Sequence, residues 1–284
     1  MWIYDAGCIK TKSSHVCSGL IGRSWALVFI SGGFSVRIYD ALEGGISNSL
    51  RVCKKLWQLF LSAGGKKALA KVQEQMNLLS VLTQGGECVF EDLAVKQGVF
   101  LDVECLVGSD VILSSSTSCL VPSDVFSKVQ HKSRCMVAHP VNPPYLVKLV
   151  ELVPHPETSS SVMDTAHALM TQVGQVPVRL HRELDGFALN RIQMAVIAES
   201  WRLVQDGVIS VKDVDLVMSE GLGMRYAFIG PMETMHLNAP QGNHTQRELG
   251  TFHLFQYEQL HGTWYFMVLK SLSMSNTFSV HMLQ

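Results

Sequence analysis

The chain has 284 residues, 47% of them hydrophobic, which predicts one large domain or two modest domains with a substantial core. Its 23 Lys and Arg residues nearly balance its 24 Asp and Glu residues, so the net charge of −1 gives no electrostatic basis for nucleic acid as a partner. The seven cysteines are an odd number without C-x-x-C spacing. This pattern favours reduced thiols in the cytoplasm over a disulfide framework or a metal site.

Neither end of the chain carries a pattern typical of secretion or of membranes. Residues 1–16 contain Asp5, Lys10 and Lys12 and lack an apolar core, so we do not expect a signal peptide. The longest late apolar run, Trp264–Leu269, is too short to span a bilayer. We therefore expect a cytoplasmic protein with no membrane partner.

A turn containing glycines predicts a dinucleotide site near the N-terminus. Gly19 and Gly22 introduce a helical pattern, and the alternating segment Phe34–Tyr39 then predicts a strand that stops at Asp40. This order resembles the dinucleotide fingerprint, in which a helix start faces the pyrophosphate and an acidic side chain binds the adenosine ribose. The alternative is that the two glycines serve only an ordinary loop and close helix packing.

Two parts of that fingerprint are absent. Cys17 occupies the place of the first glycine, and the polar segment Ile9–His15 stands where a buried strand of Val and Ile is expected. We therefore expect the first strand of the sheet to be disrupted. The following residues, 42–79, are predicted to be mostly helical, and Glu87–Glu91 predicts a short strand that runs into a helix carrying Lys96.

Three short apolar runs in the middle of the chain predict buried strands of a parallel sheet. They are Val111–Leu113, Met136–Ala138 and Leu149–Val153. Ser118, His139 and Glu151 lie at the ends of these runs, so we expect a hydroxyl, an imidazole and a carboxylate at one rim of the sheet. An imidazole held by a carboxylate beside a hydroxyl is suited to proton transfer. The alternative is a polar turn at Ser114–Ser118 and a loop histidine.

Val176–Leu180 is predicted to close the α/β part, and helices follow it. Helical spacing predicts a long helix over Asp185–Gln205, with Asn190 in its second turn, and a further helix over Val211–Met218. The composition changes near Pro240, and the sequence beyond it has no clear periodicity.

Positions 18–240 closely resemble the 3-hydroxyacyl-CoA dehydrogenase superfamily. The matching segments are Ser18–Asp40, Val111–Leu120, His139–Thr158, Asp185–Arg191 and Leu216–Thr234. Within the superfamily, Ser219–Tyr226 is similar to the branch that oxidises L-gulonate rather than to the fatty-acid branch. The resemblance implies an α/β fold: a Rossmann-type doubly wound sheet, followed by an all-α second domain that is truncated here.

The resemblance also implies a function, namely NAD-dependent oxidation of a 3-hydroxy acid, L-gulonate to 3-dehydro-L-gulonate, by a homodimer. His139 would be the general base, held by Glu151, while Ser118 and Asn190 would complete the catalytic group and bind the reacting oxygen. The residues that would bind NAD are Gly19, Leu20, Ile21, Gly22, Asp40, Glu91 and Lys96. Arg225 is our candidate for the substrate carboxylate, and a surface or interface ion pair is the alternative.

We divide the chain into an NAD-binding Rossmann domain (1–182), a partial helical dimerisation and substrate domain (183–240), and a divergent tail (241–284). Compared with the family, the first strand is disrupted, a segment near 81–86 is shortened, and the helices after Pro240 are replaced. These departures favour a second interpretation: a catalytically impaired isoform, or a structural relative of the crystallin type, in which the homodimer is weakened.

Overall fold

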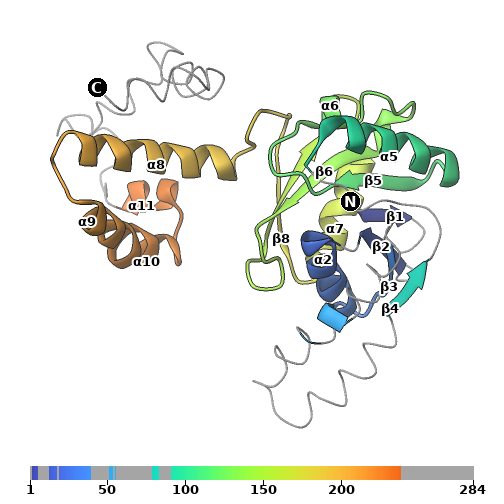
Figure 1. Cartoon of the computed structure of the whole chain (residues 1–284), viewed down its shortest axis with the longest axis horizontal. Coiled ribbons are helices and arrows are strands. Elements are labelled where there is room, and N and C mark those ends of the chain that lie inside the picture. Colours follow the sequence, from blue (N-terminus) through green and yellow to red (C-terminus); the bar gives the residue numbers. More distant parts are fainter. Residues whose placement is uncertain are drawn as a thin grey trace, which may run out of the picture. The chain divides into compact units, whose positions relative to one another are not determined.

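The computed structural model describes residues 2–5, 13–17, 19–39, 51–53, 55, 79–82 and 91–237. The chain divides into two compact units, residues 1–191 and 192–284 (Figure 1). The boundary predicted at residues 182 and 183 lies shortly before this division, which falls inside a helix.

The described part of the first unit contains an eight-stranded mixed sheet in the order β4-β3-β2-β1-β5-β6-β7-β8. Neighbouring strands run parallel in the pairs β2/β3, β3/β4, β5/β6 and β7/β8, and antiparallel in the pairs β1/β2, β1/β5 and β6/β7. The strands are β1 (Trp2–Asp5), β2 (Ser13–Cys17), β3 (Ser35–Tyr39), β4 (Leu79–Leu82), β5 (Val111–Ser115), β6 (Cys135–Pro140), β7 (Leu149–Pro154) and β8 (Val176–Arg179).

The N-terminal part of the sheet differs from the sequence-based expectation. We expected the polar segment Ile9–His15 to disrupt the first strand, but Ser13–Cys17 forms β2 and pairs on both sides. Strand pairing is made by backbone groups, so polar side chains do not prevent it. The departure from a doubly wound sheet lies instead in β1, which is inserted between β2 and β5 and runs antiparallel to both.

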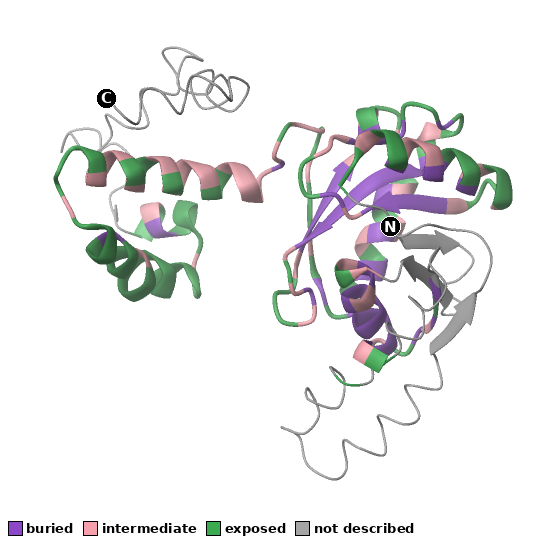
Figure 2. Cartoon of the chain, viewed as in Figure 1, coloured by how far each residue is buried: buried purple, intermediate pink, exposed green. Residues whose placement is uncertain are grey.

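Helices cover both faces of this sheet. They are α2 (Leu20–Ser31), α5 (Leu93–Leu106), α6 (Pro122–Val125), the 3₁₀ turn η1 (Lys132–Arg134) and α7 (Ser160–Gln172). Successive strand residues point to opposite faces, so Ile112 packs with α2 and α7 whereas Leu113 packs with α5 and α6. The strands β5, β6 and β7 are accordingly buried over most of their length (Figure 2). This double coverage explains their continuous apolar runs.

The described helices that continue into the second unit bury few of their own residues. They are α8 (Leu189–Gln205), α9 (Val211–Leu216), the π-helical turn η2 (Val217–Leu222), α10 (Gly223–Tyr226) and α11 (Pro231–Leu237). No residue of α8 is buried, and Val214 and Thr234 are the buried residues within 192–237 (Figure 2). None of the helices described is long and apolar enough to cross a membrane.

The long helix begins four residues later than the predicted start, Asp185, because two residues adopt the left-handed backbone conformation. Gly186 has φ 73° and Phe187 has φ 51°, and neither angle fits a right-handed helix. The second predicted helix, Val211–Met218, is α-helical only to Leu216 and then widens into η2.

Candidate active site

His139 and Glu151 form a buried pair on neighbouring strands of the sheet. The register of β6 and β7 places the two residues opposite each other, and His139 Nδ1 lies 2.8 Å from Glu151 Oε2. The residues are 5% and 2% exposed. The contact pairs Nδ1 with the carboxyl group, so Nε2 is the ring nitrogen left to exchange a proton with a ligand.

The expected direction of one strand in this pairing was wrong. We predicted that all three apolar runs were parallel, but β7 runs antiparallel to β6. The chain returns directly from the end of β6 to the start of β7, so the carboxyl end of one strand lies beside the amino end of the other. His139 near the end of β6 and Glu151 near the start of β7 therefore still share one end of the sheet.

The second oxygen of Glu151 is held by the start of α8. Oε1 accepts hydrogen bonds from the backbone N–H groups of Ala188 at 2.9 Å and Leu189 at 2.8 Å. These are the first amides of a helix, where a negative charge is favoured by unpaired N–H groups and by the helix dipole. Both oxygens of this buried carboxylate are thus satisfied, which is what allows a Glu to sit within a buried strand.

The Phe187 side chain packs against the imidazole at the same point. Its ring centroid lies 5.4 Å from that of His139, and the side chain is fully buried. Its positive φ turns the chain so that the next two amides, Ala188 and Leu189, reach Glu151. Sequence analysis did not identify these three residues. The glycine at 186, just before an apolar residue and a helix, is the signal that could have found the turn.

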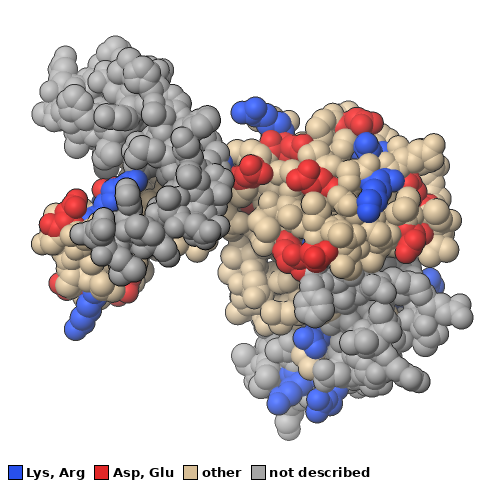
Figure 3. All heavy atoms as spheres, turned by 45° about the horizontal axis from the view of Figure 1, so that its top comes forward, with Lys and Arg blue, Asp and Glu red and all other residues tan. Residues whose placement is uncertain are grey.

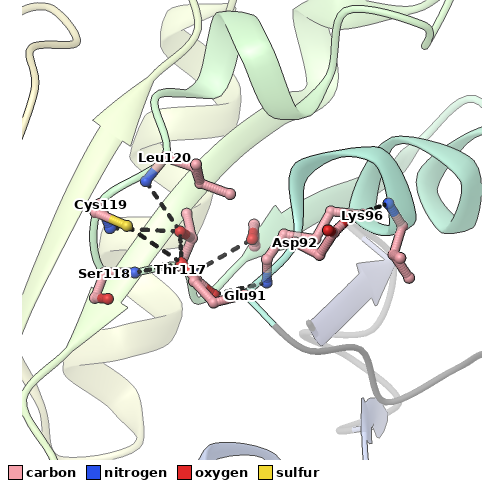
Figure 4. Close-up of polar contacts among 9 residues, drawn as sticks. Glu91, Asp92, Lys96, Thr117, Ser118, Cys119 and Leu120 are labelled. Carbon is pink, nitrogen blue, oxygen red and sulfur yellow. Dashed lines mark hydrogen bonds and ion pairs between the residues drawn. The ribbon is translucent and has the colours of Figure 1, made fainter.

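The loop after β5 is fixed by Glu91, at the N-terminal side of α5. Glu91 Oε1 accepts a hydrogen bond from the Thr117 hydroxyl and another, at 3.2 Å, from the Ser118 backbone N–H (Figure 4). Its other oxygen, Oε2, forms an ion pair with Lys96 Nζ at 3.1 Å. Asp92 Oδ1 caps α5 by accepting from the Val95 N–H at 2.9 Å, which sets the position of the helix start beside the loop.

These contacts determine the charge of Glu91. Partial burial acts to raise the pKa of its carboxyl group, but the Thr117 hydrogen bond, the Lys96 ammonium and the Ser118 amide together hold that pKa below 4.5, its ordinary value. Glu91 is therefore ionised at neutral pH. The predicted cofactor residues Glu91 and Lys96 are brought together, and Thr117 is a member of the cluster that sequence analysis missed.

Asn190 joins this loop to the His139–Glu151 pair. Its Nδ2 group donates a hydrogen bond to the Ser118 carbonyl oxygen at 2.6 Å. The residue before it, Leu189, supplies one of the amides that hold Glu151. The first turn of α8 therefore contacts both clusters, and the four predicted catalytic residues, Ser118, His139, Glu151 and Asn190, belong to one connected arrangement.

The first turn of α2 fits the pyrophosphate role predicted for it. The helix begins at Leu20, and its N-cap, Gly19, provides no side-chain acceptor for the helix amides. The first turn contains no acidic residue, so no negative charge of the helix itself competes with an anion there. Gly22 is buried and Leu20 is 60% exposed. Asp40, the predicted ribose ligand, lies outside the described residues.

Arg225, the predicted carboxylate ligand, is exposed in α10 of the second unit. Among the described residues, no three His, Cys, Asp or Glu side chains gather as metal ligands would. Acidic and basic side chains both occur on the face of the first unit that Figure 3 shows.

Comparisons with known proteins match both parts of the chain. Residues 14–184 match the family model of the 3-hydroxyacyl-CoA dehydrogenase NAD binding domain, and residues 186–261 match that of the C-terminal domain. The second match includes residues 241–261, which we had assigned to the divergent tail. That assignment stays a prediction, because residues 238–284 lie outside the described part.

Individual relatives agree with the family models. The chain is 52% identical over 244 residues to the lambda-crystallin homolog of Homo sapiens, covering 82% of this chain and 75% of the relative. It is 34% identical over 240 residues to the 3-hydroxyacyl-CoA dehydrogenase of Gibberella moniliformis, covering 82% and 74%. The crystal structure of M. tuberculosis FadB2 aligns with a TM-score of 0.68 at 25% identity, covering 75% of this chain and 78% of that one. The chain therefore belongs to the 3-hydroxyacyl-CoA dehydrogenase family, and its first unit is an NAD-binding Rossmann domain.

Proposed function

We propose that this protein oxidises the 3-hydroxyl group of a small hydroxy acid, converting L-gulonate to 3-dehydro-L-gulonate. The observation that supports it most is the His139 imidazole, held on one side by Glu151 at 2.8 Å and free to use its other nitrogen. NAD, when bound, supplies the nicotinamide ring that accepts a hydride from C3. L-gulonate is a free carboxylic acid, whereas the substrates in the family's name are thioesters of coenzyme A.

The proposed reaction balances as a two-electron oxidation. The hydride leaves C3 with two electrons, and the hydroxyl proton passes to His139 Nε2, so that the C–O single bond becomes a carbonyl. Glu151 stabilises the imidazolium that forms, and the helix amides that hold its second oxygen keep the side chain in place. The proton then leaves His139 to water.

The other residues of the arrangement bind and orient. Ser118 lies on a loop that Glu91 and Asn190 hold through its backbone groups, and its hydroxyl would hydrogen-bond the reacting oxygen. A loop held in one position keeps that contact aligned and would lower the barrier. Gly19, Leu20, Ile21 and Gly22 would hold the pyrophosphate at the start of α2, and Asp40 would bind the adenosine ribose. Arg225 is the candidate for the substrate carboxylate.

Titration of the full chain with NADH, followed by turnover with L-gulonate, tests the proposal. NADH fluorescence should saturate, and L-gulonate should be oxidised in preference to 3-hydroxybutyrate and to 3-hydroxybutyryl-CoA. Preference for the acyl-CoA ester would overturn the substrate assignment and keep the reaction type. Saturable NADH binding without oxidation of any of the three would contradict the reaction type.

A catalytically impaired or structural role, of the crystallin type, is the second candidate. It is supported by the inserted strand β1, which separates β2 from β5, and by α8, which buries none of its residues. The family resemblance implies a homodimer, and the exposed residues of α8 favour one that is weaker than a form with the family's C-terminal helices restored. The reduced thiols expected from the cysteine pattern favour a cytoplasmic location. Sedimentation and thermal unfolding of the two forms side by side test this. Equal dimerisation and equal unfolding midpoints would contradict it.

A further inference from the structure

A hydrogen bond joins α2 to the loop that follows β5. The indole N–H of Trp25, in the second turn of α2, donates to the Ser116 hydroxyl oxygen at 3.0 Å. The Trp25 side chain is 0% exposed and packs beside Phe29, with ring centroids 5.8 Å apart. Its ring is fixed by the core, so the direction of the N–H is fixed as well. A buried indole N–H needs an acceptor, and Ser116 supplies it.

The Trp25–Ser116 hydrogen bond spans the inserted strand β1, which is where the sheet departs from a doubly wound arrangement. The helix α2 follows β2, and Ser116 follows β5, but β1 lies between these two strands. Adjacent strands are about 4.8 Å apart, so β2 and β5 are separated by roughly 10 Å rather than paired directly. The two strands thus have no shared backbone ladder, and the Trp25–Ser116 hydrogen bond connects the elements that follow them.

The same loop carries the site residues already described. Three consecutive residues are held by contacts from three parts of the chain. Ser116 is held by Trp25 of α2, Thr117 by Glu91 before α5, and Ser118 by the same Glu91 and by Asn190 of α8. Of these partners, Trp25 lies on α2, the helix whose first turn we propose as the pyrophosphate site. The Trp25–Ser116 hydrogen bond therefore fixes the distance between α2 and the loop that carries Ser118.

We propose that Trp25 is a positioning residue, which fixes the Ser116–Ser118 loop relative to the NAD-binding helix α2. The inference rests on the proposed function for its effect on turnover, whereas its effect on the loop does not depend on that function. Trp25 touches no reacting atom. It acts through Ser116, and a displaced loop moves the Ser118 hydroxyl away from the substrate oxygen. Because misplacement by about 1 Å can cost up to ~100-fold, loss of one of three tethers should cost about tenfold in kcat.

The test compares Trp25→Phe, Ser116→Ala and the double variant with the parent, all in the full chain. Phe keeps an aromatic ring in the core and removes the N–H donor. Each single variant should lower kcat by about tenfold while the Kd for NADH changes less than about twofold. The double variant should be no slower than either single variant, because both remove the same hydrogen bond. Trp201→Phe, at a half-exposed tryptophan of α8, is the matched control and should leave kcat unchanged.

Hydrogen–deuterium exchange of the peptide covering 113–120 provides a readout that needs no turnover. Both single variants should exchange faster than the parent in this peptide, and Trp201→Phe should not. If the parent turns over no substrate, the proposed function fails, and exchange alone decides the positioning role. If Trp25→Phe does not fold, Ser116→Ala decides it. Parent-like kcat and parent-like exchange in Ser116→Ala, or additive losses in the double variant, would overturn the inference.

Discussion

Residues 91–191 of the first unit and residues 192–237 of the second contain similar side chains but bury them very differently. In the first, apolar strands lie between two helical layers, and a polar pair such as His139–Glu151 is enclosed with its hydrogen bonds made. In the second, Ile192, Ile197 and Trp201 of α8 are all exposed, and the ion pair of Glu199 with Arg202 is on the surface. A side chain of a given type should therefore contribute more to the free energy of unfolding in residues 91–191 than in residues 192–237.

Replacement of the buried histidine should give the largest effect. We expect His139→Ala to reduce kcat by about 10²–10⁴-fold, because a general base is lost, while NADH still binds. Steady-state kinetics with L-gulonate and NADH titration of the variant check this. An equivalent change at exposed His236 in α11 should leave both quantities as in the parent. If the His139→Ala variant kept more than half of the parent activity, His139 would not be the general base.

Two Glu→Gln changes compare a buried and an exposed carboxylate directly. Glu151→Gln removes the charge held by His139 and by two helix amides, and should destabilise the fold by roughly 1–3 kcal/mol. Glu199→Gln removes a half-exposed partner of Arg202 and should cost less than about 0.5 kcal/mol. Denaturant unfolding with a common m-value measures both. Equal losses of unfolding free energy in the two variants would show that burial does not distinguish the two carboxylates.

Glu104 should make the stability of the first unit sensitive to acid. This carboxylate accepts from the backbone N–H groups of Gln130 and His131, and lies 3.6 Å from Arg134 Nη2. Burial acts to raise its pKa, but these hydrogen bonds and the guanidinium outweigh burial and hold the pKa below 4.5, its ordinary value.

A carboxyl group whose pKa is lowered on folding stabilises the fold above its unfolded pKa and loses that contribution as the pH falls through the folded value. The unfolding midpoint of Glu104→Gln should therefore lie below that of the parent at pH 7, and the gap should narrow below about pH 4.5. Thermal unfolding from pH 7 to pH 3 measures the gap. Asp206→Asn, at an exposed carboxylate, should show no such narrowing. A gap that is constant with pH would show that Glu104 is not held ionised by folding.

The smallest effect on stability is expected on α8. Ile192 is 62% exposed, so Ile192→Gln should change the free energy of unfolding of the isolated chain by no more than about 0.5 kcal/mol. Replacement of fully buried Phe100 by Ala should cost about 3–5 kcal/mol. Concentration-dependent sedimentation and chemical unfolding of the two variants separate folding from association. A large, concentration-independent loss for Ile192→Gln would show that α8 is covered within one chain.

Local patterns predicted much of the central sheet. The apolar runs Val111–Leu113, Met136–Ala138 and Leu149–Val153 indicated β5, β6 and β7, because strands covered on both faces have little room for polar residues. Glycines and helical spacing likewise indicated α2. The start of α8 was misplaced, since the left-handed backbone at Phe187 has no strong local signal in a non-glycine residue.

Only the tertiary structure decided the directions of the strands and the partners of segments that are distant in sequence. Periodicity reports which side chains are buried, and it carries no information on strand order, so neither the antiparallel direction of β7 nor the insertion of β1 between β2 and β5 was predictable. The same holds for the amides that hold Glu151 and for the Trp25–Ser116 hydrogen bond, which joins residues 91 positions apart. The sequence determined which chemical groups are present. The path of the chain determined which of them meet, because a hydrogen bond depends on distance and direction in space.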